Sequence, residues 1–201
     1  ATNFLSGPYN ASGLGLAYKK ATNLLKGETI LIDFSPYEPS LGAPASFIAS
    51  PVFKNNELIG ILAFQMPLAK INEVMNDRAW LGKSGESYLI GSDGKLRSDS
   101  FLFNKNTVEN SFAGKVDHVY SKVDGFIQAK SGKTGIKQTN SYHFTDVLTS
   151  YSPISILDLK WIIITEMEIS EILASLEVIQ FFYLILGLAL MIIIPFCAFF
   201  L

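Results

Sequence analysis

The C-terminal segment of this chain, from Phe181 to Leu201, contains no charged residue. At a rise of about 1.5 Å per residue, a helix of this length extends for about 30 Å, which is the thickness of the hydrocarbon core of a bilayer. A helix that is apolar on every face does not suit the surface of a soluble domain. The segment therefore predicts a transmembrane helix at about residues 181–201 and places the preceding polar residues on one side of a membrane.

The residues before this span show no pattern that is typical of catalysis, metal binding or nucleic-acid binding. The formal net charge is −2 and the sequence has no basic patch, which argues against a nucleic-acid partner. The single cysteine, Cys197, lies within the span, and a cysteine-free polar region fits an extracytoplasmic setting. Because no Ser-His-Asp, paired-carboxylate or metal-ligating pattern emerges, we predict no catalytic residues, no metal, no cofactor and no enzymatic activity in this part of the chain.

A weak internal repeat organises the polar region. Ala49–Val52 (ASPV) and the apolar run at 58–66 reappear in the second half of the chain as Tyr151–Ile154 (YSPI) and the run at 159–167. A helical pattern follows each block. The repeat predicts two tandem copies of one small domain rather than a single large domain.

The first copy is predicted to close with two strands and a helix. Ser46–Lys54 and Glu57–Met66 read as paired strands, with Asn55-Asn56 as a two-residue hairpin turn, because asparagine tolerates the positive φ of such turns. Pro67 suits the first turn of the helix that follows. The paired strands are apolar on both faces, so we expect both faces to be covered.

The second copy shows more strands, in the order β-β-α-β-β-β, which is typical of a PAS-like antiparallel sheet. Its last strand is expected to feed an unbroken helix over Ile169–Leu201, and Trp161 is expected to pack in its core. The predicted elements are the strand Glu86–Ser92, a turn at Asp93-Gly94, the return strand Lys95–Asp99, a helix at about 117–129, and the strands Gly135–Tyr142, Asp146–Ile154 and Leu157–Glu168.

Three runs of this sequence resemble double Cache sensor domains. Gly85–Ser100 (GESYLIGSDGKLRSDS) resembles their second module, Asp33–Phe53 resembles the close of their first module, and Leu148–Glu168 is similar to the strand pair that leads them into the membrane. The resemblance implies an α+β fold of tandem PAS-like Cache modules with antiparallel sheets and a C-terminal transmembrane helix. The expected units are residues 1–78 (the C-terminal part of a truncated, membrane-distal first module), residues 79–168 (the membrane-proximal second module) and residues 169–201 (a signalling helix that continues into the span).

The same resemblance implies a function in bacterial signalling. Proteins of this kind carry a periplasmic sensor region that binds a small-molecule ligand, cross the inner membrane, act as homodimers and have a cytoplasmic output domain in the same chain. We expect the ligand-binding region of a chemotaxis receptor, and the regulatory ectodomain of a nucleotide cyclase or sensor histidine kinase stays open as the alternative. A membrane-anchored adhesion domain is a third possibility. Ala1 does not begin a signal peptide, so an export signal or earlier span is expected upstream.

Candidate ligand-binding residues lie at the close of the first module. In amino-acid-sensing double Cache domains, a carboxylate near the end of the last strand of this module grips the amine of the ligand. Gln65 stands at the matching position here, so the resemblance does not extend to an amino-acid ligand. If Gln65 is buried, its amide needs a ligand or backbone partners. Asp33 and Tyr37 either bond a ligand or belong to a rigid proline-rich loop. The expected pocket residues are Phe34, Tyr37, Phe47 and Gln65, with Asp33 at its mouth.

The second module offers a further set of candidates at its first hairpin, namely Tyr88, Arg97 and Asp99. Arg97 is able to bind a carboxylate in bidentate fashion, or it pairs with Asp99 or with the loop around Glu86. Glu166 and Glu168 precede the C-terminal helix, and their charge suits its N-terminal dipole.

Overall fold

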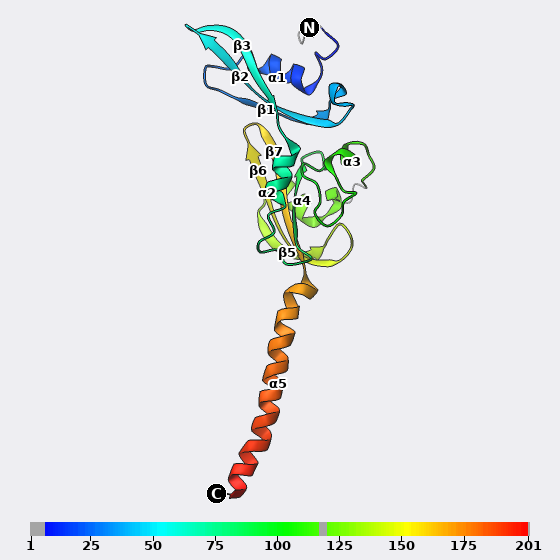
Figure 1. Ribbon diagram of the computed structural model, residues 1–201, viewed down its shortest axis with the longest axis vertical. Coiled ribbons are helices and arrows are strands. Elements are labelled where there is room, and N and C mark those ends of the chain that lie inside the picture. Colours follow the sequence, from blue (N-terminus) through cyan, green and yellow to red (C-terminus); the bar gives the residue numbers. More distant parts are fainter. Residues whose placement is uncertain (1–6, 117–119, 201) are drawn as a thin grey trace.

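Two antiparallel sheets follow one another along the long axis of the molecule, and a single long helix extends from the second sheet (Figure 1). This computed structural model describes residues 7–116 and 120–200. The first sheet has the strand order β1-β2-β3 and the second has the order β4-β7-β6-β5. The expected combination of antiparallel sheets, helices and a C-terminal apolar helix is therefore confirmed.

The first sheet consists of β1 (Ile30–Pro36), β2 (Pro44–Lys54) and β3 (Glu57–Gln65). The predicted hairpin turn joins β2 to β3, with φ of 50° at Asn55 and 66° at Asn56. A short helix, α1 (Gly13–Ala21), covers one face, and the Ser12 hydroxyl caps it by accepting a hydrogen bond from the Gly15 amide. A one-turn 3-10 helix, η1 (Glu38–Ser40), lies between β1 and β2.

The two faces of this first sheet differ in burial. The face beneath α1 forms a small core in which Ala17, Ile32 and Phe47 are buried. On β3, in contrast, the apolar side chains of Leu62 and Phe64 are exposed. The expectation that both faces of this strand pair are covered is wrong for the part of the chain that the structure describes, because α1 is the helix that packs on this sheet and it covers one face.

The second sheet consists of β4 (Glu86–Gly91), β5 (Gly135–Asn140), β6 (Asp146–Ile156) and β7 (Leu159–Glu168). Helix α2 connects it to the first sheet and α4 packs on β6 and β7. Its core includes Tyr88, Phe126 and the buried Trp161, as expected. The helical elements are α2 (Leu68–Met75), α3 (Val108–Phe112), η2 (Tyr120–Lys122) and α4 (Asp124–Lys130).

Two predictions for the second module need correction. Lys95–Asp99 is not a strand, since it shares one isolated bridge with β4, between Ile90 and Leu96. The reason is that its side chains take part in the bonding: the Ser98 hydroxyl accepts from the Leu89 amide of β4, and Asp99 accepts from the Val108 amide at the start of α3. The predicted helix begins at Asp124 rather than near 117, and residues 117–119 lie outside the described residues.

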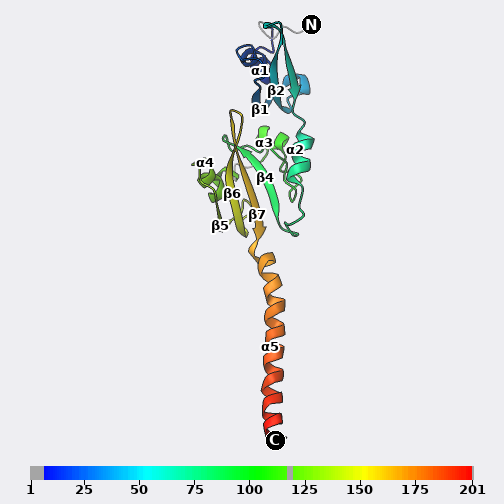
Figure 2. The same ribbon diagram turned by 90° about the vertical axis from the view of Figure 1, so that its left-hand side faces the viewer.

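Helix α5 (Ile169–Phe200) follows β7 without an intervening loop, so strand and helix form one continuous path (Figure 2). The predicted unbroken helix is confirmed. By length and composition, the part from Ile169 to Pro195 is sufficient to cross a membrane. The end of β7 is therefore also the start of this helix.

Candidate functional site

The residues predicted to line a first-module pocket lie in different places. Tyr37 and Phe47 pack together near α1, with ring centroids 5.0 Å apart. Phe34 lies in the core of the second sheet, 6.2 Å from the Trp161 ring. Gln65 is exposed at the end of β3, so the expectation of a buried amide is wrong. Whether any of these residues binds a ligand stays a prediction.

An irregularity in β1 explains why Phe34 turns away from Phe47. The register between β1 and β2 shifts between Ile32 and Ser35, which leaves Asp33 and Phe34 in a bulge. A bulge re-aims side chains, and here it directs both residues toward the second sheet. Sequence alternation alone places Phe34 with Ile32 on the α1 side, so the pattern could not reveal this change of face.

Asp33 forms a polar junction between the two sheets. Its Oδ1 and Oδ2 accept hydrogen bonds from Arg97 Nε and Nη2, both at 2.8 Å, and Oδ1 also accepts one from Trp161 Nε1 at 3.1 Å. The Arg97 side chain is 2% exposed and also pairs with Asp93 at 3.0 Å. Burial alone lowers the pKa of Arg97, but the bonds to Asp33 and Asp93 raise it overall, so the guanidinium stays charged.

This geometry corrects the expected roles of the hairpin candidates. Arg97 pairs neither with Asp99 nor with the loop around Glu86, but with an aspartate of the first sheet. Asp99 instead accepts hydrogen bonds from the Val108 amide and from Asn72 Nδ2, both at 2.7 Å, and so ties α2 to the start of α3. Tyr88 is buried in the core of the second sheet, where its ring lies 5.2 Å from that of Tyr120. The three side chains do not converge on one site.

A pair of carboxylates lies buried between β4 and β7. Glu86 and Glu166 are direct cross-strand partners, although like charges in this position repel. Glu86 is well supplied with donors: the Tyr142 hydroxyl, the Ser100 hydroxyl at 2.7 Å and two backbone amides. Glu166 is 3% exposed, and its Oε1 accepts one long bond from Thr149, at 3.4 Å. Glu86 is therefore the better stabilised anion of the two.

Two atoms of this cluster, the Tyr88 hydroxyl and Glu166 Oε2, are buried without a hydrogen bond among the described residues. Burial raises the pKa of Glu166 to about 7, with a further contribution from the charge of Glu86, while the nearby Tyr88 and Thr149 hydroxyls oppose the shift. Glu166 therefore does not cap α5, as the sequence suggested. It projects into the core because it lies on β7, whose side chains alternate between faces.

Glu171, in the first turn of α5, is the residue that accepts hydrogen bonds at the start of this helix. Its carboxylate accepts hydrogen bonds from the Lys83 amide at 2.8 Å and from the Ser84 amide at 2.7 Å, and the Ser84 hydroxyl donates a third at 2.5 Å. The Ser84 hydroxyl, followed by the two amides, lowers the pKa of Glu171 to about 2. This clamp ties the loop before β4 to the first turn of α5. Sequence spacing gives no signal for it, because the partners are 87 residues apart.

Several concave sites lie around the second sheet. The most apolar, of about 360 Å³, lies between α2 and the β6–β7 hairpin. A second, of about 450 Å³, lies beside the start of α4 and the end of β5, and a third, of about 500 Å³, lies near Lys130 and Lys160. Phe34, Tyr37, Phe47 and Gln65 line none of these three. The apolar pocket is lined by Met66, Pro67, Lys70, Ile71, Val74, Met75, Leu89, Ile156 and Trp161.

Within the described residues, no group of three or more His, Cys, Asp or Glu side chains is placed to hold a metal ion. The site features are thus a buried inter-sheet junction, a buried carboxylate pair, a clamp on α5 and pockets of small-molecule size. Together with two antiparallel sheets that run into an apolar helix, they define the class of a PAS-like α+β domain that is followed by a long apolar helix.

A family comparison identifies the particular kind of sensor. The family model of the double Cache type, described as Cache domain, matches residues 5–176. This chain therefore belongs to the Cache-domain family, and the resemblance seen in the sequence is confirmed. A comparison with curated protein sequences found no match.

Solved structures with a similar fold are sensory domains from outside the cytoplasm. The periplasmic sensory domain of the Campylobacter jejuni chemoreceptor Tlp1 has a TM-score of 0.52 and 17% identity, over 74% of this chain and 53% of that one. The ligand-binding domain of the Pseudomonas aeruginosa amino-acid chemoreceptor PctC, in complex with GABA, has a TM-score of 0.52 and 14% identity, over 84% and 66%. The extracellular domain of the putative histidine kinase mmHK1S-Z3 has a TM-score of 0.52 and 21% identity, over 85% and 58%. This chain thus spans between about half and two thirds of the length of these structures.

Proposed function

We propose that this chain is the sensor region and following transmembrane helix of a bacterial chemotaxis receptor. The observation that carries the proposal is the connection between sensing fold and span: β7 runs directly into α5, and β7 also carries Trp161, which is bonded to Asp33 of the first sheet. A change in the first sheet thereby has a short physical path to the membrane. The sensor region lies outside the cytoplasm, and the receptor acts as a homodimer with an output domain beyond α5 in the same chain.

The signal in this proposal is a shift between two packings of the sheets. A small molecule binds one packing more tightly and so raises its population. The Asp33–Arg97–Trp161 junction passes the change in packing to β7. The Glu171 clamp makes the loop before β4 move together with α5. The α5 helix then moves by a small translation or rotation across the bilayer. Interfaces of this kind are bistable, so a small shift is sufficient.

The ligand itself is proposed only as a class, a small molecule that fits a pocket of a few hundred Å³. The structure of PctC holds GABA, but the carboxylate that the amino-acid-sensing pattern requires is replaced here by the exposed Gln65. Asp33, Tyr37, Phe47 and Gln65 remain the proposed first-module contacts. The apolar pocket that shares Trp161 with the junction is the alternative location. Calorimetric titration of Tyr37→Ala and Ile71→Ala against a library of small metabolites separates the two locations.

The alternative output is a histidine kinase, and the ectodomain of mmHK1S-Z3 has the same fold. Both proposals share one orientation in the membrane. The residues between Lys160 and the apolar run include no Lys or Arg, as expected for the translocated side.

Reporter fusions after Leu201 test this orientation. A fluorescent protein that folds only in the cytoplasm is expected to be active there, and alkaline phosphatase at the same position is expected to be inactive. Phosphatase activity without fluorescence places Leu201 outside and contradicts the proposal. Joining Leu201 to the cytoplasmic domain of a chemoreceptor or of a histidine kinase then distinguishes the two outputs.

A further inference from the structure

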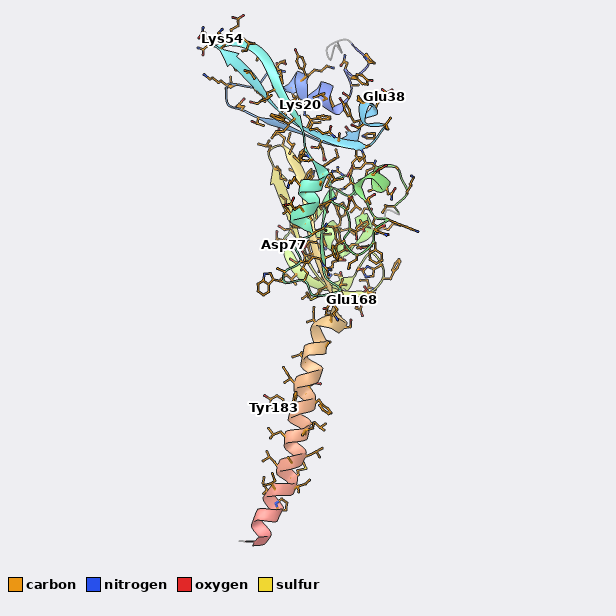
Figure 3. The ribbon with its side chains drawn as sticks, viewed as in Figure 1. Lys20, Glu38, Lys54, Asp77, Glu168 and Tyr183 are labelled. Carbon is orange, nitrogen blue, oxygen red and sulfur yellow. The ribbon has the colours of Figure 1, made fainter. Side chains whose placement is uncertain are left out.

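Three loops gather at the end of the second sheet from which α5 departs. The loop at 76–85 is there because its Lys83 and Ser84 amides bind Glu171 of α5. The loop at 100–107 is held by Glu86, which accepts from the Phe101 amide and pairs across the sheet with Glu166 near the end of β7. The turn at 141–145 projects past this end, because Val147 already pairs with Glu168, the last residue of β7. Figure 3 shows Glu168 where the second sheet meets the helix.

These loops expose aromatic side chains toward solvent. Trp80 is 91% exposed and Phe144 is 81% exposed, and Phe101 and Phe103 are exposed as well. The four residues, called here the aromatic rim, come from all three loops. The loops also contact one another: the Arg78 guanidinium lies 4.0 Å from the centre of the Phe101 ring, and the Phe103 ring lies 5.1 Å from that of His143. The rim is therefore one surface rather than scattered exposed residues.

Phe144 occupies a position that an aromatic residue rarely takes. Its φ is +66°, in the left-handed region where glycine and asparagine are favoured. A bulky apolar residue there gains nothing from packing, since most of its side chain is exposed. The Phe144 amide bonds back to the Ser141 carbonyl, so this φ belongs to a tight turn that presents the Phe144 ring to solvent.

The distance between these loops and the bilayer determines whether the aromatic rim contacts lipid. From Glu171, which holds the loop at 76–85, to Glu177, the last charged residue before the apolar run, α5 rises about 9 Å at about 1.5 Å per residue. The headgroup layer beyond the hydrocarbon core adds about 5–7 Å on each side. If α5 spans the membrane, as the proposed function states, the loops are within one side-chain length of the headgroups when the distance is counted from Glu177, and within about 10 Å when it is counted from Phe181, where the predicted span begins.

The geometry points to the aromatic rim as a membrane-docking surface, in which Trp80, Phe101, Phe103 and Phe144 insert among the headgroups of the outer face. The amphipathic tryptophan ring favours this level of a bilayer, and exposed phenylalanine rings bury apolar area at the boundary between headgroups and acyl chains. The loops carry acidic and basic residues together (Asp77, Arg78, Lys83 and Lys105), without the cluster of Lys and Arg that favours anionic lipids, so the matching lipid is zwitterionic. Docking holds the second module at a fixed height, so that a shift of β7 moves α5 and does not tilt the whole domain.

The tryptophan content of the chain makes this proposal testable by fluorescence. The chain has two tryptophans, Trp80 and the buried Trp161, and the span has none. The 201-residue chain is reconstituted in phosphatidylcholine vesicles, with and without lipids brominated near the top of the acyl chain. The emission contributed by Trp80 is expected to fall by roughly half, because an indole at the headgroup level lies within reach of the bromines.

Two variants supply the controls. Trp80→Phe leaves only Trp161 and is expected to show almost no quenching. Adding Leu25→Trp to Trp80→Phe moves the exposed indole to the loop between α1 and β1, where Leu25 is 71% exposed, and this variant is also expected to show no quenching. The proposal is overturned if acrylamide fully quenches the Trp80 emission and the brominated lipid does not. The proposal is also overturned if neither quencher reaches Trp80. That result indicates that Trp80 contacts protein, such as a second copy of this chain.

An alkaline carbonate wash of the same vesicles separates this proposal from the one on which it rests. Protein that stays with the vesicles has inserted α5, so absent quenching then contradicts only the docking surface. Protein that the wash removes contradicts the membrane-spanning role of α5 itself.

Discussion

The strands β3 and β7 come from the same repeated sequence pattern and meet different surroundings. In the repeat, Ile61 of β3 corresponds to Ile162 of β7, and Gln65 corresponds to Glu166, because the members of each pair lie 101 residues apart. The strand β7 pairs on both edges, with β4 and β6, whereas β3 pairs with β2 alone among the described residues. Consequently Ile162 and Glu166 are buried, while Gln65 is exposed and Ile61 is half-buried.

This comparison shows that burial is decided by neighbours rather than by the strand's own sequence. Both runs are apolar enough to be central strands, and only one of them is central here. It also shows where a signal can travel. The strand with two partners touches the junction at Trp161 and continues into α5, so movement in it cannot remain local.

The largest expected effect comes from removing Trp161. Its side chain is 2% exposed and packs against Phe34, so Trp161→Ala is expected to lower the free energy of unfolding by about 3–5 kcal/mol. Phe64→Ala, on the exposed face of β3, serves as the matched control and should cost less than about 1 kcal/mol. Denaturant unfolding followed by circular dichroism measures both. Equal losses in the two variants are incompatible with the different burial of β3 and β7.

A smaller effect is expected from pH, through Glu166. Its pKa is raised from 4.5 to about 7, so between these values the folded protein binds a proton more tightly than the unfolded chain does. The stabilisation is complete below pH 4.5 and is lost as pH rises toward 7, a decrease of about 3 kcal/mol in the free energy of unfolding. Glu166→Gln is expected to flatten this decrease and to be the more stable protein above pH 7.

Unfolding curves recorded across that pH range test the prediction. Glu171 does not interfere, because its lowered pKa, about 2, confines its effect to more acidic pH. Wild-type stability that rises between pH 4.5 and 7, or a Glu166→Gln variant with the same slope as the wild type, contradicts the assignment.

The smallest expected effect concerns Gln65, which corresponds to Glu166 in the repeat. Because Gln65 is exposed, Gln65→Ala is expected to change the free energy of unfolding by less than about 0.5 kcal/mol at any pH. Thermal unfolding of the two variants in parallel gives the comparison. A loss above about 1.5 kcal/mol shows instead that the Gln65 amide has a buried partner.

Local sequence signals predicted most of the regular structure. The Asn55-Asn56 turn fixed the first hairpin, and the apolar runs located β4, β5, β6, β7 and α5 within a few residues. The predicted return strand at Lys95–Asp99 is absent, because the Ser98 and Asp99 side chains accept hydrogen bonds from the Leu89 amide of β4 and the Val108 amide of α3. Helix α3 was missed because a five-residue helix is too short to show a period.

The candidate site was harder to predict, because its contacts join residues far apart in the chain. Asp33 and Arg97 are 64 residues apart, and several acidic residues were equally plausible partners for the arginine. The bulge that turns Asp33 and Phe34 toward the second sheet leaves no mark in the alternation of apolar residues. The position of Glu166 depends on which strands flank β7, and that is a property of the whole sheet.

Hydrogen exchange of β7 in the Asp33→Asn variant tests most directly whether the first sheet is coupled to α5. Asp33→Asn weakens the bonds to Arg97 and Trp161 and leaves the side chain nearly the same size. Amides of residues 159–172 in the reconstituted chain are expected to exchange faster in this variant, while Phe64→Ala leaves them unchanged. Faster exchange confined to β1, with β7 and the first turn of α5 as protected as in the wild type, would show that the junction does not link the first sheet to the membrane helix.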